Sequence, residues 1–267
     1  SLPAMEHLAL GLVWLLGTVA SVSPMHKEVP IMEMDMVPNS FDDQYLGCSE
    51  MMEEKLQELN YTEFDTNEIY AVAWKEAITQ LQGRMSQSSV LQPVQAIALM
   101  AYTLNDPPLQ KEFNAAVHEA GRSREEYLHN FQFKALHFLL TKALHALRDV
   151  QPHHCYHVYL GVVNIIFTAQ PGEIVRFGMF AYSSLDKMHA ENIDKGTIFS
   201  VETCYGVLIR DFSFFQDEDE VLIPPFETFK VTRMTHKGNR SHIELHSQDA
   251  YSNYNCEFLK GDVLGDG

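Results

Sequence analysis

The chain has 267 residues, of which 46% are hydrophobic and 21% are charged, a composition typical of a globular protein rather than a disordered one. Its formal net charge of −17 argues against a nucleic acid as partner, because phosphate binding needs clustered Lys and Arg side chains. A cationic protein surface is a more natural partner, since opposite charges favour encounter.

The first element is an apolar run from Leu8 to Ala20, which has the length of a signal-peptide core and is too short to span a bilayer comfortably. We therefore assign residues 1–23 to upstream sequence and a secretory signal peptide. No later apolar run is long enough to span a membrane, and the C-terminus lacks the hydrophobic tail of a lipid-anchor signal. We expect a secreted, extracellular protein without such an anchor.

Cysteine usage agrees with secretion. An even number of cysteines behind a signal peptide predicts disulfides, and spacing alone leaves three pairings open for Cys48, Cys155, Cys204 and Cys256. Two sequons, at Asn60 and Asn239, are candidate glycosylation sites where they are exposed.

Apolar residues recur with a helical period between residues 50 and 148. The pattern predicts a helix over 61–81, a buried helix over 94–102 that Pro93 opens, and a helix over 109–120 that Gly121 stops. A capping box of Ser123 and Glu126 predicts the start of one long helix that runs through Leu147.

After Asp149 the period changes to two, which indicates strands. They are expected at 156–160, 173–181, 197–204, 221–223, 229–234 and 242–245. Helices followed by strands indicate an α+β fold, with an extended segment and helical subdomain over 24–149 and a β-rich core over 150–260. The Gly-rich stretch 261–267 is interpreted as a tail.

An acidic stretch, Asp217 to Glu220, stands directly before the apolar strand 221–223, which Pro224 ends. Because alternate residues of a strand share a face, Glu218 and Glu220 are expected on one side and Asp219 on the other. The pair is either a catalytic or binding lip or a solvated acidic turn.

Several longer motifs carry a family resemblance: Phe-Asp-Asp-Gln-Tyr at 41–45, Lys-Glu-Phe-Asn-Ala-Ala-Val at 111–117, Val-Arg-Phe-Gly at 175–178, Glu-Val-Leu-Ile-Pro at 220–224 and Tyr-Asn-Cys-Glu at 254–257. Together they resemble the vertebrate arginine-specific ecto-mono-ADP-ribosyltransferases over roughly residues 41–259. The resemblance implies a mostly antiparallel β-sandwich core and the disulfides Cys48–Cys256 and Cys155–Cys204. It also implies transfer of ADP-ribose from NAD or NADP to arginine side chains of acceptor proteins, with release of nicotinamide and without a metal.

On the same resemblance Glu220 is the catalytic carboxylate and Glu218 confers arginine specificity. Two positions depart from the family pattern. Leu160 stands where an Arg meets the nucleotide phosphate, and Tyr182 stands where a Ser helps to position the catalytic Glu. A leucine cannot make a charge-assisted bond to phosphate, so weaker NAD binding is expected.

The remaining nucleotide-contacting candidates are Gly161, Ser184 and Tyr102, although a tyrosine on a buried helix is more often a core residue. Ile193 stands near the place of a nicotinamide-stacking Phe. Arg176 is interpreted as a structural ion-pair partner. His153, His154 and His157 are interpreted as solvated residues rather than metal ligands, because no third-ligand context accompanies them.

Two functions follow from these features. The first is an NAD-consuming arginine transferase, which the intact Glu218 and Glu220 favour. The second, which Leu160 and Tyr182 favour, is a catalytically silent extracellular binding protein or a residual NAD glycohydrolase.

Overall fold

The computed structural model describes residues 29–82, 84, 90–104, 108–151, 155–215 and 218–264, with side chains through residue 261. The predicted signal peptide, Asp217, His153 and His154 lie outside the described residues.

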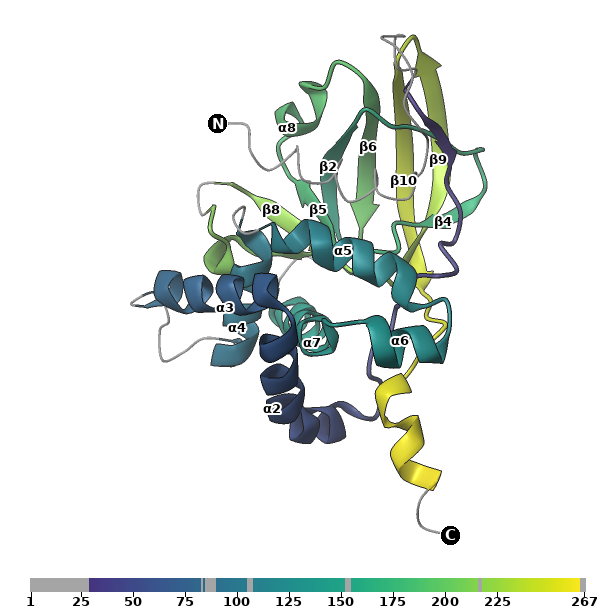
Figure 1. The fold of residues 1–267 in the computed structure, drawn as a ribbon. Coiled ribbons are helices and arrows are strands. Elements are labelled where there is room, and N and C mark those ends of the chain that lie inside the picture. The colour runs from purple at the N-terminus through teal and green to yellow at the C-terminus, as the bar shows by residue number, and fades with distance from the viewer. Residues whose placement is uncertain are drawn as a thin grey trace, which may run out of the picture.

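Six helices form the lower half of the molecule in Figure 1, around a central α7. They are α2 (Ser49–Thr66), α3 (Glu68–Leu81), α4 (Pro93–Thr103), α5 (Leu109–Ala120), α6 (Arg124–Asn130) and α7 (Lys134–Val150). As predicted, Pro93 stands at the start of the nearly all-buried α4. Gly121 follows α5, but with φ −84° it needs no left-handed backbone. It is glycine because a Cβ there would lie 2.4 Å from the carbonyl oxygen of Ser40.

The strands form the upper half of the molecule and make an eight-stranded sheet in the order β4-β9-β10-β6-β2-β5-β8-β7. Their bounds are β2 (Tyr156–Val163), β4 (Ile174–Arg176), β5 (Ala181–Ser184), β6 (Gly196–Thr203), β7 (Val207–Leu208), β8 (Glu220–Ile223), β9 (Glu227–Lys237) and β10 (Arg240–Ala250). All pairs are antiparallel except β6 with β10. A short parallel pair, β1 (Ile31–Glu33) with β3 (Ile166–Thr168), and a short helix α8 (Met188–Glu191) complete the fold.

The prediction of one continuous helix over 61–81 is wrong, because the helix is interrupted at Asn67. This residue has an extended backbone, with φ −126° and ψ 92°, and its side-chain oxygen accepts a hydrogen bond from the Tyr70 amide at 3.1 Å. An Asn that caps the next helix ends the previous one, since its side chain competes with the helical backbone bonds. The segment is therefore the end of α2 followed by α3.

The single helix predicted from Ser123 through Leu147 is also wrong. Ser123 caps α6 as expected, with its Oγ 3.0 Å from the Glu126 amide, but the helix stops at Asn130. The buried carboxylate of Glu63, on α2, starts α7 by accepting the backbone N–H of Lys134 at 2.6 Å and of Ala135 at 2.9 Å. A residue some seventy positions away in the chain thus supplies the cap.

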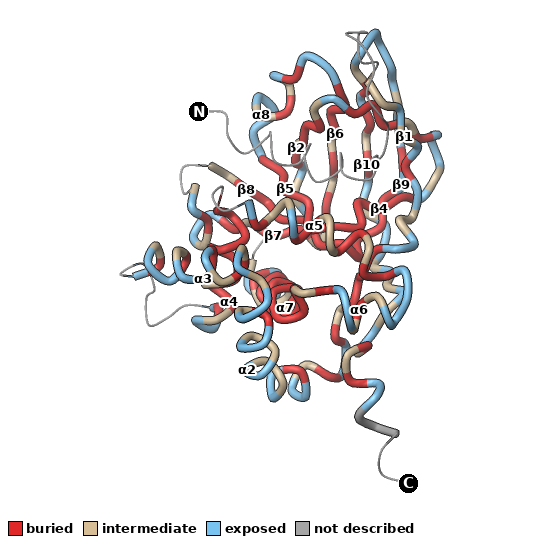
Figure 2. Tube along the Cα trace, in the orientation of Figure 1, coloured by how far each residue is buried: buried red, intermediate tan, exposed pale blue. Residues whose placement is uncertain are grey.

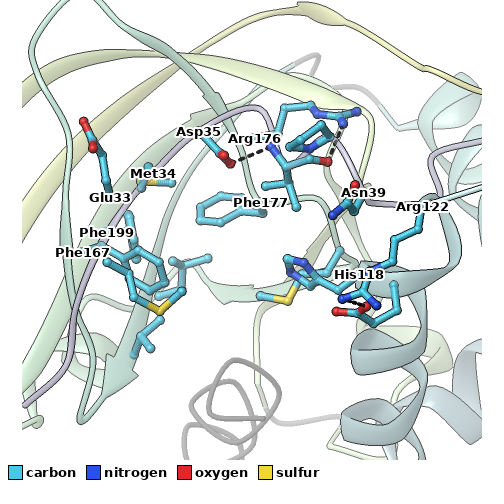
Figure 3. Close-up of a pocket in the computed structure, with 17 residues that line it drawn as sticks. Glu33, Met34, Asp35, Asn39, His118, Arg122, Phe167, Arg176, Phe177 and Phe199 are labelled. Atoms are coloured by element: carbon cyan, nitrogen blue, oxygen red, sulfur yellow. Dashed lines mark hydrogen bonds and ion pairs between the residues drawn. The ribbon is translucent and has the colours of Figure 1, made fainter. Parts of the chain in front are cut away.

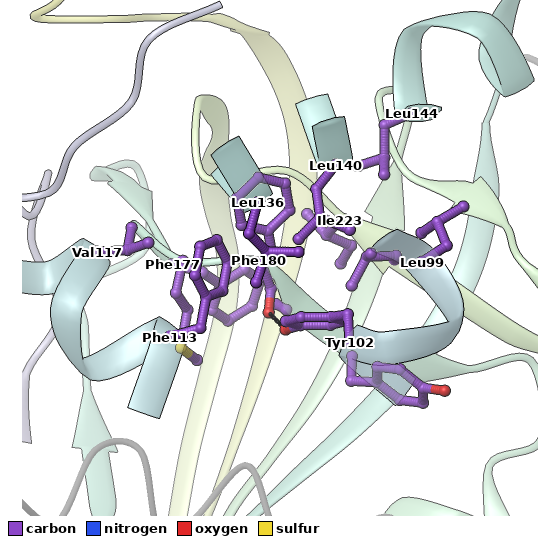
Figure 4. Packing of buried hydrophobic residues seen from close by; sticks show 14 of the residues in the cluster. Leu99, Tyr102, Phe113, Val117, Leu136, Leu140, Leu144, Phe177, Phe180 and Ile223 are labelled. Carbon is purple, nitrogen blue, oxygen red and sulfur yellow. Dashed lines mark hydrogen bonds between the residues drawn. The ribbon is translucent and has the colours of Figure 1, made fainter. Parts of the chain in front are cut away.

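The strand predicted over 173–181 consists of two strands, β4 and β5, which lie in different parts of the sheet. β4 is the edge strand beside β9, whereas β5 lies between β2 and β8. The residues between them carry Phe180 into the core, where it packs near Phe113 and Tyr102 (Figure 4). Strands β1, β3 and β7, which have two or three residues each, were not predicted.

One hydrophobic core joins helices and sheet. α7 is buried over most of its length (Figure 2). Its Leu136 and Leu140 lie near Phe180, which precedes β5, and near Ile223 of β8 (Figure 4). The core therefore fixes the position of β5 and β8, the strands that carry Tyr182 and Glu220.

Two buried carboxylates clamp the segment after β1 to the C-terminal end of the chain. Asp42 accepts hydrogen bonds from Arg176 at 2.6 Å and from the Asn253 and Tyr254 amides at 2.8 and 3.0 Å. Asp43 accepts the amides of Cys256 and Glu257, both at 2.9 Å.

The predicted disulfides Cys48–Cys256 and Cys155–Cys204 are both confirmed, and the first closes the clamp covalently. Arg176 forms the structural ion pair that the sequence predicted, and the side chains of both Arg176 and its partner Asp42 are fully buried.

This clamp generates a stability prediction. Asp42→Asn leaves the Arg176 guanidinium buried without a counter-charge, so we expect the free energy of unfolding to fall by about 3–5 kcal/mol. Chemical denaturation followed by circular dichroism measures the change. Glu50→Gln removes one negative charge from the exposed face of α2 and should change stability by less than about 0.5 kcal/mol. Equal effects of the two substitutions would contradict the assigned role of the pair.

Candidate active site

Glu220 is the first residue of β8 and directly follows Glu218 and Asp219. Glu220 is paired directly with Ser184 of β5, and Leu222 is paired with Tyr182. Because paired residues of antiparallel strands project to the same face, Tyr182, Ser184 and Glu220 share one face of the sheet. Glu220 is 1% exposed, so its carboxylate is held within the protein rather than in solvent.

Two hydroxyl groups hold one oxygen of this carboxylate. The Tyr182 hydroxyl and the Ser213 hydroxyl, the latter at 2.5 Å, both donate to Oε2 of Glu220. The other oxygen, Oε1, is buried and has no hydrogen-bond partner among the described residues. Since an unpaired buried oxygen costs free energy, Oε1 is the atom of this cluster that is ready to accept a ligand's hydroxyl group.

The surroundings of Glu220 raise its pKa to about 7. The main cause is burial, which disfavours the charged carboxylate, and the neighbouring carboxylate of Glu218 adds to the effect. The hydrogen bonds from Ser213 and Tyr182 oppose it by stabilising the anion. A carboxylate with a raised pKa in such a setting is typical of functional sites.

Glu218 and Asp219 precede the strand and have separate roles. Asp219 forms an ion pair with Arg210 at the surface, and its carbonyl oxygen accepts the Leu185 amide at 3.0 Å. Glu218 is close enough to Glu220 to affect its titration. The structure therefore brings the two predicted carboxylates together and turns the side chain of Asp219 to another partner.

The structure places Tyr102, a predicted nucleotide contact, inside the core on α4. It is fully buried, and its hydroxyl donates to the carbonyl oxygen of Phe180 at 2.6 Å and accepts a bond from Asn114 at 3.0 Å. Its ring centroid lies 6.4 Å from that of Tyr182. Tyr102 thus supports Tyr182 from the helical side of the core.

Ser184 and Gly161 lie where α8 packs against the sheet. The Ser184 hydroxyl is 3.1 Å from Nδ1 of His189, a residue of α8. A Cβ on Gly161 would lie 3.2 Å from the carbonyl oxygen of Ala190 and 3.3 Å from the side chain of Ile193. Gly161 therefore permits the close approach of α8, and the side chain of Ile193 is buried next to Gly161.

Leu160 lies apart from the other predicted residues. Adjacent residues of a strand project to opposite faces, so Leu160 points away from the face of Tyr159 and Gly161. It lines a cavity of about 330 Å³ between the sheet and α5, together with Val162 and Phe199 (Figure 3). The position that the resemblance assigns to a phosphate contact is thus part of an apolar wall.

His157 forms a hydrogen-bonding pair with Ser200, with 3.0 Å between its Nε2 and the Ser200 hydroxyl. Within the described ranges no group of three or more His, Cys, Asp or Glu side chains is arranged to hold a metal ion. Ser183 donates to the carbonyl oxygen of Val221 at 2.7 Å, which makes it a structural residue.

Sequence reasoning missed two residues of this site. Ser213 lies seven positions before Glu220 and carries no local signal that would link the two side chains. Asn114 is part of the 111–117 motif, but nothing in the motif predicts that its amide binds the Phe180 carbonyl oxygen at 3.1 Å. Both contacts depend on how the chain folds back on itself.

Comparison with known proteins agrees with this geometry. Residues 34–253 match the family model described as NAD:arginine ADP-ribosyltransferase. The chain is 53% identical to the erythroblast NAD(P)(+)--arginine ADP-ribosyltransferase of Gallus gallus over 260 residues, which cover 95% of this chain and 86% of that protein. It is 44% identical to the GPI-linked NAD(P)(+)--arginine ADP-ribosyltransferase 1 of Mus musculus over 275 residues, 97% and 84% of the two chains.

The fold agrees as well. The crystal structure of the eucaryotic mono-ADP-ribosyltransferase ART2.2 superposes with a TM-score of 0.72 at 35% sequence identity and covers 84% of this chain and 98% of its own. Mutants of that protein have been solved in complex with NADH and with NAD. The α+β class, with helices followed by a mostly antiparallel sheet, is therefore confirmed, and the chain belongs to the NAD:arginine ADP-ribosyltransferase family.

Proposed function

We propose that this protein transfers ADP-ribose from NAD or NADP to arginine side chains of acceptor proteins and releases nicotinamide. The observation that carries the proposal is the buried Glu220, whose Oε2 is held by Tyr182 and Ser213 while Oε1 stays unpaired beside Glu218. The arginine transferase names of its relatives support the same reaction.

Glu220 and Glu218 have different roles in this reaction. The bond between nicotinamide and ribose breaks as positive charge develops on the sugar, and a carboxylate at the ribose hydroxyls stabilises that charge. Oε1 of Glu220 is the available acceptor for such a hydroxyl. Glu218 orients the incoming guanidinium and takes the proton that it loses when its nitrogen bonds to the ribose carbon.

A catalytically weak binding protein is the second candidate function, and two observations favour it. The Tyr182 hydroxyl occupies Oε2 of Glu220, and its ring fills the space beside it. Leu160 is an apolar residue at the position where the family resemblance implies a phosphate-binding Arg. Turnover of labelled NAD with agmatine as the acceptor, measured on the full oxidised chain, decides between the two functions.

We further propose that the protein works outside the cell. Its two disulfides are typical of an oxidising compartment. Relatives are described as ecto-enzymes or as GPI-linked. In the described part of the chain, no helix has both the length and the apolar character needed to cross a bilayer.

Glu218→Gln separates the two reactions. The amide keeps the shape of the side chain but loses the charge that binds a guanidinium, so transfer to agmatine should fall at least tenfold while hydrolysis of NAD persists. The matched control is Asp219→Asn, since Asp219 pairs with Arg210 and should leave the ratio of the two activities unchanged. Equal loss of transfer and hydrolysis in Glu218→Gln would exclude the specificity role.

The departure from the family pattern at Tyr182 generates a second test. Tyr182→Ser removes the ring that fills the space beside Glu220 and keeps a hydroxyl at that position of β5, so it should lower the dissociation constant for NAD and raise agmatine turnover. We expect about a tenfold gain in affinity, which corresponds to roughly 1.4 kcal/mol. Calorimetric titration with NAD measures the affinity. If the parent already binds as tightly as the variant, the Tyr182 ring does not limit NAD binding.

Glu220→Gln tests how much the ionised carboxylate of Glu220 lowers the free energy of unfolding. A pKa raised to about 7 means that Glu220 contributes most to stability when protonated, and this contribution is lost as pH rises through about 7. The glutamine amide does not ionise, so the variant does not lose this contribution as pH rises. The stability of the variant relative to the parent should therefore increase between pH 5 and pH 8.5, by roughly 2–4 kcal/mol. Denaturant melts at both pH values measure the difference, and a pH-independent difference would show that Glu220 titrates normally.

A further inference from the structure

The cavity between the sheet and α5 has walls suited to an aromatic ring. Its volume of about 330 Å³ lies at the lower end of the range for small-molecule pockets, roughly 300–1,000 Å³. Figure 3 shows Phe177 projecting into the middle of the cavity, with Phe167 and Phe199 on one side. The Phe199 ring centroid lies 5.8 Å from that of Phe167 and 5.4 Å from that of Phe177. A flat apolar molecule can stack against these rings.

One polar atom in the wall lacks a partner. His118, on α5, lies across the cavity from Phe199 (Figure 3), is 8% exposed, and its Nε2 forms no hydrogen bond with any described residue. Burial lowers the pKa of His118 to about 4, so the imidazole is neutral at physiological pH. In the tautomer with its proton on Nδ1, Nε2 is a hydrogen-bond acceptor.

The charges at the cavity favour a cation. Among the charged side chains that line it, Arg122 pairs with Glu119 at 2.5 Å and Arg176 pairs with Asp42. Glu33 and Asp35 also line the cavity, and neither is in an ion pair within the described part of the chain. Asp35 and Arg176 are both near enough to His118 to influence its pKa, Asp35 by raising it and Arg176 by lowering it, but the charge of Arg176 is already balanced by Asp42.

We propose that this cavity is a binding site for a small apolar molecule with a single ammonium group. Its ring system lies against Phe177 and Phe199, and its ammonium group donates to Nε2 of His118 beside the carboxylate of Asp35. The proposal does not depend on the transferase activity. Of the residues that the sequence predicted for the nucleotide, Leu160 alone lines this cavity.

A matched set of three probes tests the charge preference: naphthylmethylamine, naphthylmethanol and naphthoate. They share a ring and differ in carrying a cation, a neutral hydroxyl or an anion. Titrated into the full oxidised chain and followed by probe fluorescence, the amine should bind about tenfold more tightly than the alcohol, and naphthoate should bind most weakly. Equal affinities, or tighter binding of naphthoate, would overturn the proposal.

Three variants locate the probe. Asp35→Asn keeps the side-chain oxygen that accepts the Val37 amide, so it should remove the preference for the amine and leave the affinity for the alcohol unchanged. His118→Leu should weaken both the amine and the alcohol, because the acceptor is lost. Leu160→Arg places a positive charge in the wall and should reverse the order of amine and naphthoate.

Asp65→Asn is the matched control, because it removes the same charge from the exposed end of α2. It should change none of the three affinities. An identical loss of amine binding in Asp35→Asn and Asp65→Asn would mean that the amine responds only to net charge, which would overturn the site. Thermal melts of each variant establish that it is folded, and Asp35→Asn alone decides the matter if a buried substitution unfolds the chain.

Discussion

The buried ion pair of Asp42 and Arg176 is the constraint on which the rest of the structure depends. The Arg176 guanidinium also donates to the carbonyl oxygens of Met36, Val37 and Tyr251, so this single side chain joins β4 to both ends of the described chain. A charge pair without solvent is stable only when its remaining donors and acceptors are satisfied, and here they are. The disulfide Cys48–Cys256 closes the same junction covalently.

This junction positions the catalytic strands from a distance. β5 follows β4 after a short connection, and that connection is held in place because the Ser40 hydroxyl donates to the Gly178 carbonyl oxygen at 2.5 Å. The Asn114 amide of α5 binds the next part of the connection at Phe180. Helices, N-terminal segment and sheet therefore all determine where Tyr182 enters the site.

The Tyr182–Glu220 contact shows how a substitution at a catalytic site can both support and obstruct it. The phenol donates the hydrogen bond that a smaller hydroxyl would supply, and together with Ser213 it opposes the rise in the pKa of Glu220 that burial causes. The same ring takes up space next to the carboxylate. Leu160 places an apolar side chain where the family resemblance implies a cation, in the wall of a cavity that three acidic and two Arg side chains also line.

The sequence by itself determined the α+β class, the start of α4 at Pro93, the cap at Ser123 and, through the family motifs, both disulfides and the pair Glu218 and Glu220. These features depend on a local period, on one residue's backbone chemistry or on a continuous motif, all of which are visible in a linear chain.

The tertiary structure alone decided the rest. The start of α7 depends on a carboxylate from α2, and β4 and β5 separate because the Phe180 side chain is buried between them. Folding buries Tyr102 against the Phe180 carbonyl oxygen, and strand alternation turns Leu160 into the cavity. The hydrogen bonds of Tyr182 and Ser213 to Glu220 join residues that only folding brings together. Each of these outcomes rests on contacts between distant parts of the chain, and a local pattern contains no information about such contacts.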